Sequence, residues 1–242
     1  MKGEIMAYRF VKDVNDMRGL KDVLDVDFSP KKTCTYDCVN CGLGRTNNLT
    51  AERREFHPAE EVFNEIRDFI SEKGTPQHIM LTGSGEPTLY AGFGKLASLI
   101  KDKFKNLKVM IYTNFSLLNR EQVRKEVALC DIVWGNFNTA VDDEFTKVYQ
   151  PHESIKLQDV MDGLLKFRTE YQGALEPDTR FLRGINDSEK NIDGLKEFMK
   201  NVNPDKYRIF DAKYKGKELT QDFIATLKGT FDDLLFEVEY NV

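Results

Sequence analysis

Hydrophobic and polar residues follow two different periods along most of this chain. Short apolar runs are typical of strands, and the longer segments between them repeat their apolar residues every three or four positions, as helices do. No hairpin signal separates consecutive units, so each strand is expected to lead through a right-handed helical crossover into a parallel neighbour. The expected strands lie at about 23–28, 78–82, 108–113, 131–134, 179–182 and 207–211, and the apolar helix faces lie at 62–70, 93–100, 123–127, 157–167 and 192–199.

Two helix starts carry capping signals. Asn119, followed by Gln122, resembles a capping box, and Ser154 is expected to cap the helix at 157–167. Together with the strand pattern, these signals predict an α/β fold in which six strand–helix units form one parallel sheet.

The chain of 242 residues divides by pattern into three parts. Residues 1–20 are mixed and charged and are expected to form an N-terminal lead-in, and residues 21–211 hold the six units. Residues 212–242 add a helix face and a strand-like run as a lid or edge element. Six strands are too few to close a ring that normally needs eight. We therefore expect one side of the core to stay open, with the last part covering it only partly.

Charge and composition narrow the class of protein. The 35 Lys and Arg residues against 40 Asp and Glu residues give a formal charge of −5, so nucleic acid is a less favoured partner. No run of about 18 apolar residues is present, and residues 1–6 lack the apolar core of a secretory signal. We therefore expect a cytoplasmic protein with no membrane partner.

Three of the four cysteines, Cys34, Cys38 and Cys41, lie close together shortly after the first expected strand. Thiolates this close select zinc, copper(I) or an iron–sulfur cluster. A structural zinc site usually needs a second Cys or His pair, whereas Cys130 lies far downstream beside apolar residues, as a buried thiol would. A [4Fe–4S] cluster held by three thiolates would keep one iron open for chemistry.

The cysteine spacing resembles that of a known family. Cys34-x3-Cys38-x2-Cys41, with Gly-Ser-Gly-Glu-Pro-Thr at 83–88, is similar to the radical S-adenosylmethionine (SAM) superfamily. The runs at 43–46 and 184–188 resemble an uncharacterised prokaryotic branch of iron–sulfur oxidoreductases within it. The resemblance implies a partial (β/α)6 barrel of the radical SAM type, with a [4Fe–4S] cluster and SAM as cofactors.

The resemblance also implies roles for individual residues. The three loop cysteines would be the metal ligands, and the glycine-rich run, which alone would be read as a turn, would meet the amino group of SAM. Three asparagines follow later strands, where such a barrel places its site, although turn formation explains them equally well. The residue before the third cysteine is often aromatic in the superfamily and is Asn40 here, so no adenine contact is assigned. The candidate SAM-binding residues are Gly83, Gly85, Glu86, Asn114, Asn136 and Asn138.

The implied activity is reductive cleavage of SAM to a 5′-deoxyadenosyl radical, which abstracts a hydrogen atom from a substrate. Such an enzyme needs a reducing partner of the flavodoxin or ferredoxin kind, and we expect a polypeptide or small-molecule substrate. Two alternatives remain: an activating enzyme that makes a glycyl radical on a partner protein, and a non-catalytic iron–sulfur or metal-binding module. Against the first, Gly42 and Leu43 stand where activating enzymes usually carry His-Asn. The residues that contact the substrate stay unassigned.

Overall fold

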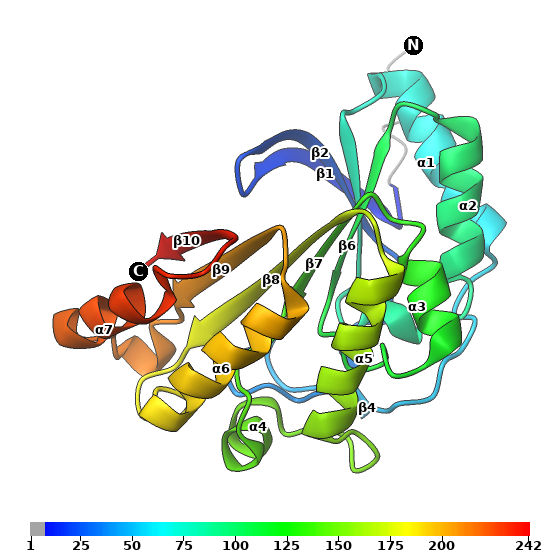
Figure 1. Ribbon diagram of the computed structural model, residues 1–242. Helices are drawn as coiled ribbons and strands as arrows, with labels where there is room; N and C mark the ends of the chain where they lie inside the picture. The colour runs from blue at the N-terminus through cyan, green and yellow to red at the C-terminus, as the bar shows by residue number, and fades with distance from the viewer. Residues whose placement is uncertain (1–7) are drawn as a thin grey trace.

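The structure, a computed structural model, describes residues 8–242 and contains an eight-stranded sheet (Figure 1). The strand order is β1-β2-β5-β6-β7-β8-β9-β10, and all neighbours are parallel except β1 and β2. The six expected parallel strands, β2 and β5 to β9, are confirmed. The strands are β1 (Val11–Met17), β2 (Leu20–Asp27), β5 (His78–Thr82), β6 (Lys108–Thr113), β7 (Ile132–Asn136), β8 (Ala174–Phe181), β9 (Lys206–Asp211) and β10 (Glu237–Asn241), with a separate pair, β3 (Thr33–Cys34) and β4 (Asn48–Leu49).

Helices cover the outer face of the curved sheet (Figure 1), and the main apolar core lies between them and the strands. Side chains alternate between the two faces, so Leu24 of β2 joins this core while Val23 belongs to the inner face. The inner-face cluster also contains Met80, Met110 and Trp134. No helix in the described part of the chain is long and apolar enough to cross a membrane. The helices are α1 (Ala59–Lys73), α2 (Phe93–Lys103), α3 (Glu121–Val127), α4 (Asp142–Tyr149), α5 (Leu157–Glu170), α6 (Glu189–Val202) and α7 (Gln221–Phe231), with short 3-10 turns η1 (Pro87–Leu89) and η2 (Tyr214–Gly216).

The barrel is open, because β1 and β10 are the two ends of the strand order. The strand-like run of the C-terminal part forms β10, which pairs in parallel with β9. Thr220 caps the preceding helix α7, since its side chain accepts a hydrogen bond from the amide of Phe223 at 3.2 Å. The C-terminal part therefore extends the sheet at its edge.

The N-terminal part differs from the prediction, because residues 11–17 form strand β1 and make a hairpin with β2. The turn residues Arg18 and Gly19 have φ of 48° and 84°, the left-handed conformation that tight hairpin turns require. Val11 is buried, but the five residues after it are exposed, so no alternation of apolar residues marked this strand. The predicted lead-in therefore missed strand β1, whereas the six predicted strands that follow are parallel and have no hairpin between them.

The parallel strands fit their predicted bounds unequally. Strands β5 and β6 have the predicted bounds, whereas β8 begins at Ala174 instead of 179. Pro177 lies inside β8, opposite Gly135 of β7, and proline usually argues against a central strand. Helix α4 was not predicted at all.

Both predicted caps were wrong. Helix α3 begins after Arg120 and helix α5 after Lys156, and neither of these residues makes a side-chain capping bond. Oγ of Ser154 instead lies 2.9 Å from Nδ1 of His152. The helices start two and three residues beyond the predicted caps, so the polar side chains belong to the preceding loops.

Candidate functional site

Loops at the carboxyl ends of the strands meet around a cavity of about 310 Å³. This is the end of a parallel barrel where active sites lie. Seven of the nine predicted site residues line the cavity, and the other two, Gly83 and Asn138, do not. The lining residues are Cys34, Cys38, Asn40, Cys41, Gly42, Gly85, Glu86, Tyr112, Thr113, Asn114, Asn136 and Arg180.

The cysteine loop is fixed by contacts to two other segments. The ring of Tyr36 is buried and stacks on Tyr149 of α4, with the ring centroids 4.6 Å apart. Oδ1 of Asp37 accepts a hydrogen bond from the amide of Thr46 at 2.7 Å. The carbonyl of the first cysteine accepts another from the amide of Thr50 at 3.0 Å. The positions of the three thiols are therefore set by α4 and by the segment 46–50.

The thiols lie among hydrogen-bond donors. Burial raises the pKa of Cys34 to about 11, helped by the nearby carboxylate of Glu86 and opposed by the ammonium of Lys32. Nζ of Lys32 donates to Sγ of Cys41 at 3.1 Å, and Nδ2 of Asn114 lies 3.7 Å from Sγ of Cys34. Donors next to sulfur favour the thiolate, which is the form that binds metal.

The donor set fits a cluster. The three loop cysteines are free and partly exposed, whereas Cys130 is buried in the main core, as the sequence predicted. Among residues 8–242, no group of three or more His, Cys, Asp or Glu side chains is arranged around a single ion position. The three thiols nevertheless line one cavity, where as soft ligands they would hold an iron–sulfur cluster.

The glycine-rich run packs directly against the cysteine loop. A Cβ on Gly85 would lie 1.8 Å from the carbonyl oxygen of Thr33, and the amide of Glu86 donates to the same oxygen at 3.0 Å. A Cβ on Gly83 would lie 2.1 Å from Oγ of Ser29. Both glycines are therefore needed because two segments touch at these points, beyond any role in a turn.

The carboxylate of Glu86 is buried at the wall of the cavity and accepts four hydrogen bonds. Oε1 accepts three, from the amide of Thr88 at 3.0 Å, from its hydroxyl at 2.6 Å and from the hydroxyl of Thr113 at 2.6 Å. Oε2 accepts one, from the amide of Asn114 at 2.8 Å. Burial raises the pKa of Glu86, and these donors oppose that effect. Because a carboxylate oxygen has two lone pairs, Oε2 can accept one more donor.

The asparagines differ in what their side chains do. Asn114 joins β6 to the cysteine loop, since its Nδ2 donates to Oγ1 of Thr35 at 2.8 Å. Asn136 lines the cavity and donates to Oδ1 of Asn138 at 2.8 Å. Asn138 is buried behind it, and its Oδ1 also accepts from the amide of Arg180 at 2.7 Å. The side chain of Asn138 thus supports the cavity wall from behind.

Five lining residues were not among the predicted site residues: Asn40, Gly42, Tyr112, Thr113 and Arg180. The hydroxyl of Tyr112 donates to the buried carboxylate of Asp178 at 3.0 Å, and Nε of Arg180 lies 3.7 Å from the same carboxylate. Tyr112 and Thr113 end a correctly predicted strand, and that position could have identified them. Asp178 lies in the part of β8 that the sequence did not predict.

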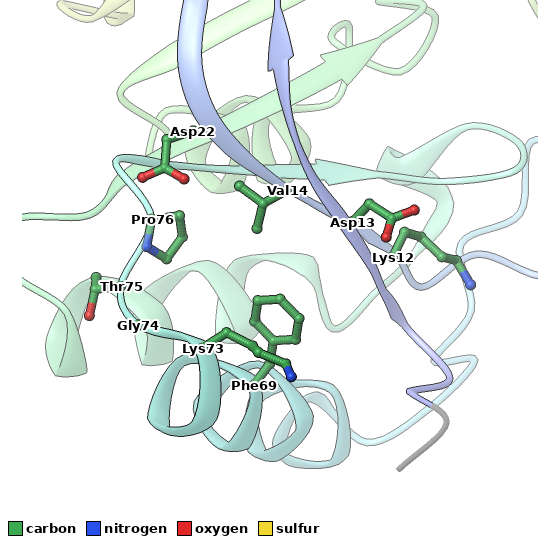
Figure 2. A pocket seen from close by; sticks show the side chains of 9 residues that line it. All are labelled: Lys12, Asp13, Val14, Asp22, Phe69, Lys73, Gly74, Thr75 and Pro76. Atoms are coloured by element: carbon green, nitrogen blue, oxygen red, sulfur yellow. The ribbon is translucent and has the colours of Figure 1, made fainter. Parts of the chain in front are cut away.

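A larger cavity, of about 460 Å³, lies at the amino end of β5 (Figure 2). Figure 2 shows Phe69 and Lys73 of α1 facing Val14 of β1, with Pro76 on the segment that leads into β5. None of the predicted site residues lines it. Parallel barrels place their chemistry at the other end of the strands, so we assign this cavity no part in the site.

Comparison with known proteins identifies the family. The sequence profile described as the Radical SAM superfamily matches residues 28–173. The chain belongs to the radical SAM superfamily. The [4Fe–4S] cluster and SAM expected from the sequence are the cofactors of this family, and the partial barrel is its fold.

Individual proteins resemble this chain in sequence or in fold. A UPF0026 protein of Methanocaldococcus jannaschii is 32% identical over 191 residues, which are 78% of this chain and 59% of that protein. A radical SAM methyltransferase from Sphaerobacter thermophilus superposes with a TM-score of 0.62 at 14% identity, over 90% of this chain and 66% of that one. SuiB from Streptococcus suis, bound to S-adenosylmethionine, superposes with a TM-score of 0.62 at 15% identity, over 91% and 48%. The two structures share the fold, and the chain spans 59% of the archaeal relative's length.

Proposed function

We propose that Cys34, Cys38 and Cys41 hold a [4Fe–4S] cluster and that the chain uses it to cleave SAM reductively. When bound, the cluster supplies an electron to SAM, which gives methionine and a 5′-deoxyadenosyl radical that takes a hydrogen atom from the substrate. The main support is that the three thiols line one cavity with Gly85 and Glu86. In this proposal the metal site and the acceptor for an ammonium group lie side by side in that cavity.

Glu86 is the residue that we assign to the amino group of SAM. Its Oε2 accepts from one protein donor and has a second lone pair, and an ammonium makes a strong, charge-assisted hydrogen bond to a carboxylate. Gly85 has no side chain between this carboxylate and the cysteine loop. The remaining donors to Glu86 hold the carboxylate in place for that contact.

The side chains on the inner face next to the cavity limit the size of the substrate and its route of entry. The guanidinium of Arg18, at the tip of the hairpin, lies 5.1 Å from the ring centre of Tyr112 and 4.9 Å from that of Trp134. Arg18 lines a separate hollow on the inner face, and Tyr112 lies between that hollow and the candidate site, since it lines both. We propose that a small molecule, or a single residue of a polypeptide, enters from the strand-end rim.

The test is anaerobic reconstitution with iron and sulfide, reduction with dithionite or a flavodoxin, and measurement of 5′-deoxyadenosine by mass spectrometry. We expect 5′-deoxyadenosine from the parent protein and from Cys130→Ala, and none from Cys38→Ala. A protein that holds about four irons and binds SAM but yields no 5′-deoxyadenosine would sink the proposal in favour of a non-catalytic module.

The class of partner needs separate tests. A glycyl-radical signal on a co-incubated partner protein would favour the activating-enzyme alternative.

For nucleic acid, titration with bulk tRNA at near-physiological salt should show weak binding, because the net charge is −5. Tight, salt-sensitive binding that is lost when Lys213, Lys215 and Lys217 are changed to Glu would reverse this preference.

A further inference from the structure

Lys32 is a buried lysine whose ammonium meets a thiol. Only 3% of the residue is exposed, and Nζ donates to Sγ of Cys41 at 3.1 Å. Within residues 8–242 its ammonium makes no ion pair with a carboxylate. An ammonium without a counter-charge is costly to bury, so a compensating negative charge is expected close by.

The backbone of Lys32 holds this side chain in place. Its φ of 57° is in the left-handed region, which is unfavourable for a residue with a Cβ. The conformation is fixed by hydrogen bonds on both sides, because its amide donates to the carbonyl of Ser84 at 2.6 Å and its carbonyl accepts from Asn47 and Asn48 at 3.0 and 3.1 Å. The glycine-rich run and the segment after the third cysteine thus both position the ammonium beside Cys41.

We propose that Lys32 tunes the iron–sulfur cluster: its ammonium donates to the sulfur of Cys41 and makes the cluster easier to reduce. This inference rests on the proposed function, since it requires that the three loop cysteines hold a [4Fe–4S] cluster. Reduction adds one electron, supplied by an external low-potential donor, to a group that is already negative. A cation and a hydrogen bond at a ligand sulfur stabilise the reduced form more than the oxidised form, which raises the reduction potential. Lys32 is therefore a positioning and tuning residue that contacts a metal ligand.

The first test measures the midpoint potential of the cluster without SAM, by redox titration followed by electron paramagnetic resonance. Lys32→Met should lower the ratio of reduced to oxidised cluster at a fixed potential about tenfold, which is about 59 mV for one electron. Lys32→Arg should stay close to the parent value, because it keeps a cationic donor. The matched control is Lys31→Met, which removes an exposed neighbouring charge and should leave the potential unchanged. A full-iron Lys32→Met protein with the parent potential would refute the inference.

A second measurement needs no substitution, and so covers the case in which Lys32→Met fails to hold iron. The parent protein, grown with lysine labelled with ¹⁵N only at Nζ, should show a weak ¹⁵N coupling to the reduced cluster in pulsed electron paramagnetic resonance. Absence of that coupling in a reduced, full-iron sample would show that the ammonium does not contact the cluster. A parent protein that forms no cluster at all would instead refute the proposed function.

Discussion

Two cations near the candidate site, the largely buried Arg18 and the buried Lys32, are neutralised in different ways. The Arg18 guanidinium forms an ion pair with Asp178 at 2.8 Å, and the Asp178 side chain is fully buried. Lys32 has the sulfur of Cys41 as its hydrogen-bond partner. The charge of Arg18 is therefore balanced inside the fold, whereas that of Lys32 is balanced only when the thiols carry negative charge. Arg18 is therefore a structural cation, whereas Lys32 would gain its counter-charge from the thiolates that hold the proposed cluster.

The structural cation joins the hairpin at one end of the open eight-stranded sheet to a strand near the other end. Arg18 sits at the turn between β1 and β2, and Asp178 lies on β8, so their ion pair spans the inner face of the sheet. The guanidinium also lies 5.3 Å from the ring centre of Phe210 on β9. The sequence led us to expect that residues 212–242 would partly cover the open side of the core. The contact across the inner face comes instead from Arg18 at the tip of the N-terminal hairpin.

The largest effect is expected from removing the cysteines of the loop that includes Cys41, the partner of Lys32. Each of Cys34→Ala, Cys38→Ala and Cys41→Ala should reduce the iron content after anaerobic reconstitution from about four per chain to near zero, because the cluster has no spare thiolate. Iron and sulfide assays measure this. Cys130→Ala is the matched control and should keep its iron, since that thiol is buried in the main core. A protein that binds one zinc ion tightly and takes up no iron on reconstitution would contradict the assignment of a [4Fe–4S] cluster.

The next largest effect is expected from removing the negative partner of Arg18. Asp178→Asn should lower the free energy of unfolding by about 3 kcal/mol, because a largely buried guanidinium loses its counter-charge. Anaerobic urea unfolding followed by circular dichroism measures it. Asp233→Asn is the control, because the carboxylate of Asp233 is exposed beside Lys196 and water screens their ion pair, so its loss should be clearly smaller. Equal losses in the two variants would show that Asp178 does not neutralise Arg18.

A smaller effect is expected at Glu86, which we assign to SAM. Glu86→Gln should raise the dissociation constant of SAM about tenfold, because an amide accepts an ammonium less strongly than a carboxylate does, and it should keep the iron. Isothermal titration calorimetry on the reconstituted protein measures the affinity. The control is Glu144→Gln, a buried glutamate of α4 that does not line the cavity. If both variants bind SAM as the parent does, Glu86 only supports the loop.

The smallest effect, and the one that separates the two cations most directly, concerns the protein without its cluster. Lys32→Met should then leave the free energy of unfolding unchanged or raise it by about 1 kcal/mol, because the methionine removes a buried charge that lacks a carboxylate partner. Arg18→Met should lower it, because Asp178 stays buried. Urea unfolding of both variants after iron chelation shows whether each substitution raises or lowers the free energy of unfolding. A clear loss of stability in Lys32→Met would mean that its ammonium is balanced by the protein alone.

The sequence by itself determined the features that depend on local spacing. Apolar periodicity gave the parallel strands, with β5 and β6 at their predicted bounds, and the cysteine and glycine-rich runs fell at strand ends because each follows its strand directly. Seven of the nine predicted site residues line the cavity for the same reason. These features are set over a few residues, within the range where propensity and periodicity act.

Only the tertiary structure decided which side chains meet. Arg18 reaches Asp178 because the hairpin turns over the inner face of a curved sheet, and no periodicity in the sequence reports that curvature. Asn138 is buried behind Asn136, although the two stand almost together in the chain. Lys32 meets Cys41 because the backbone of Lys32 is held in a left-handed conformation by two other loops. Each of these contacts depends on how distant segments pack, and packing is a property of the whole fold.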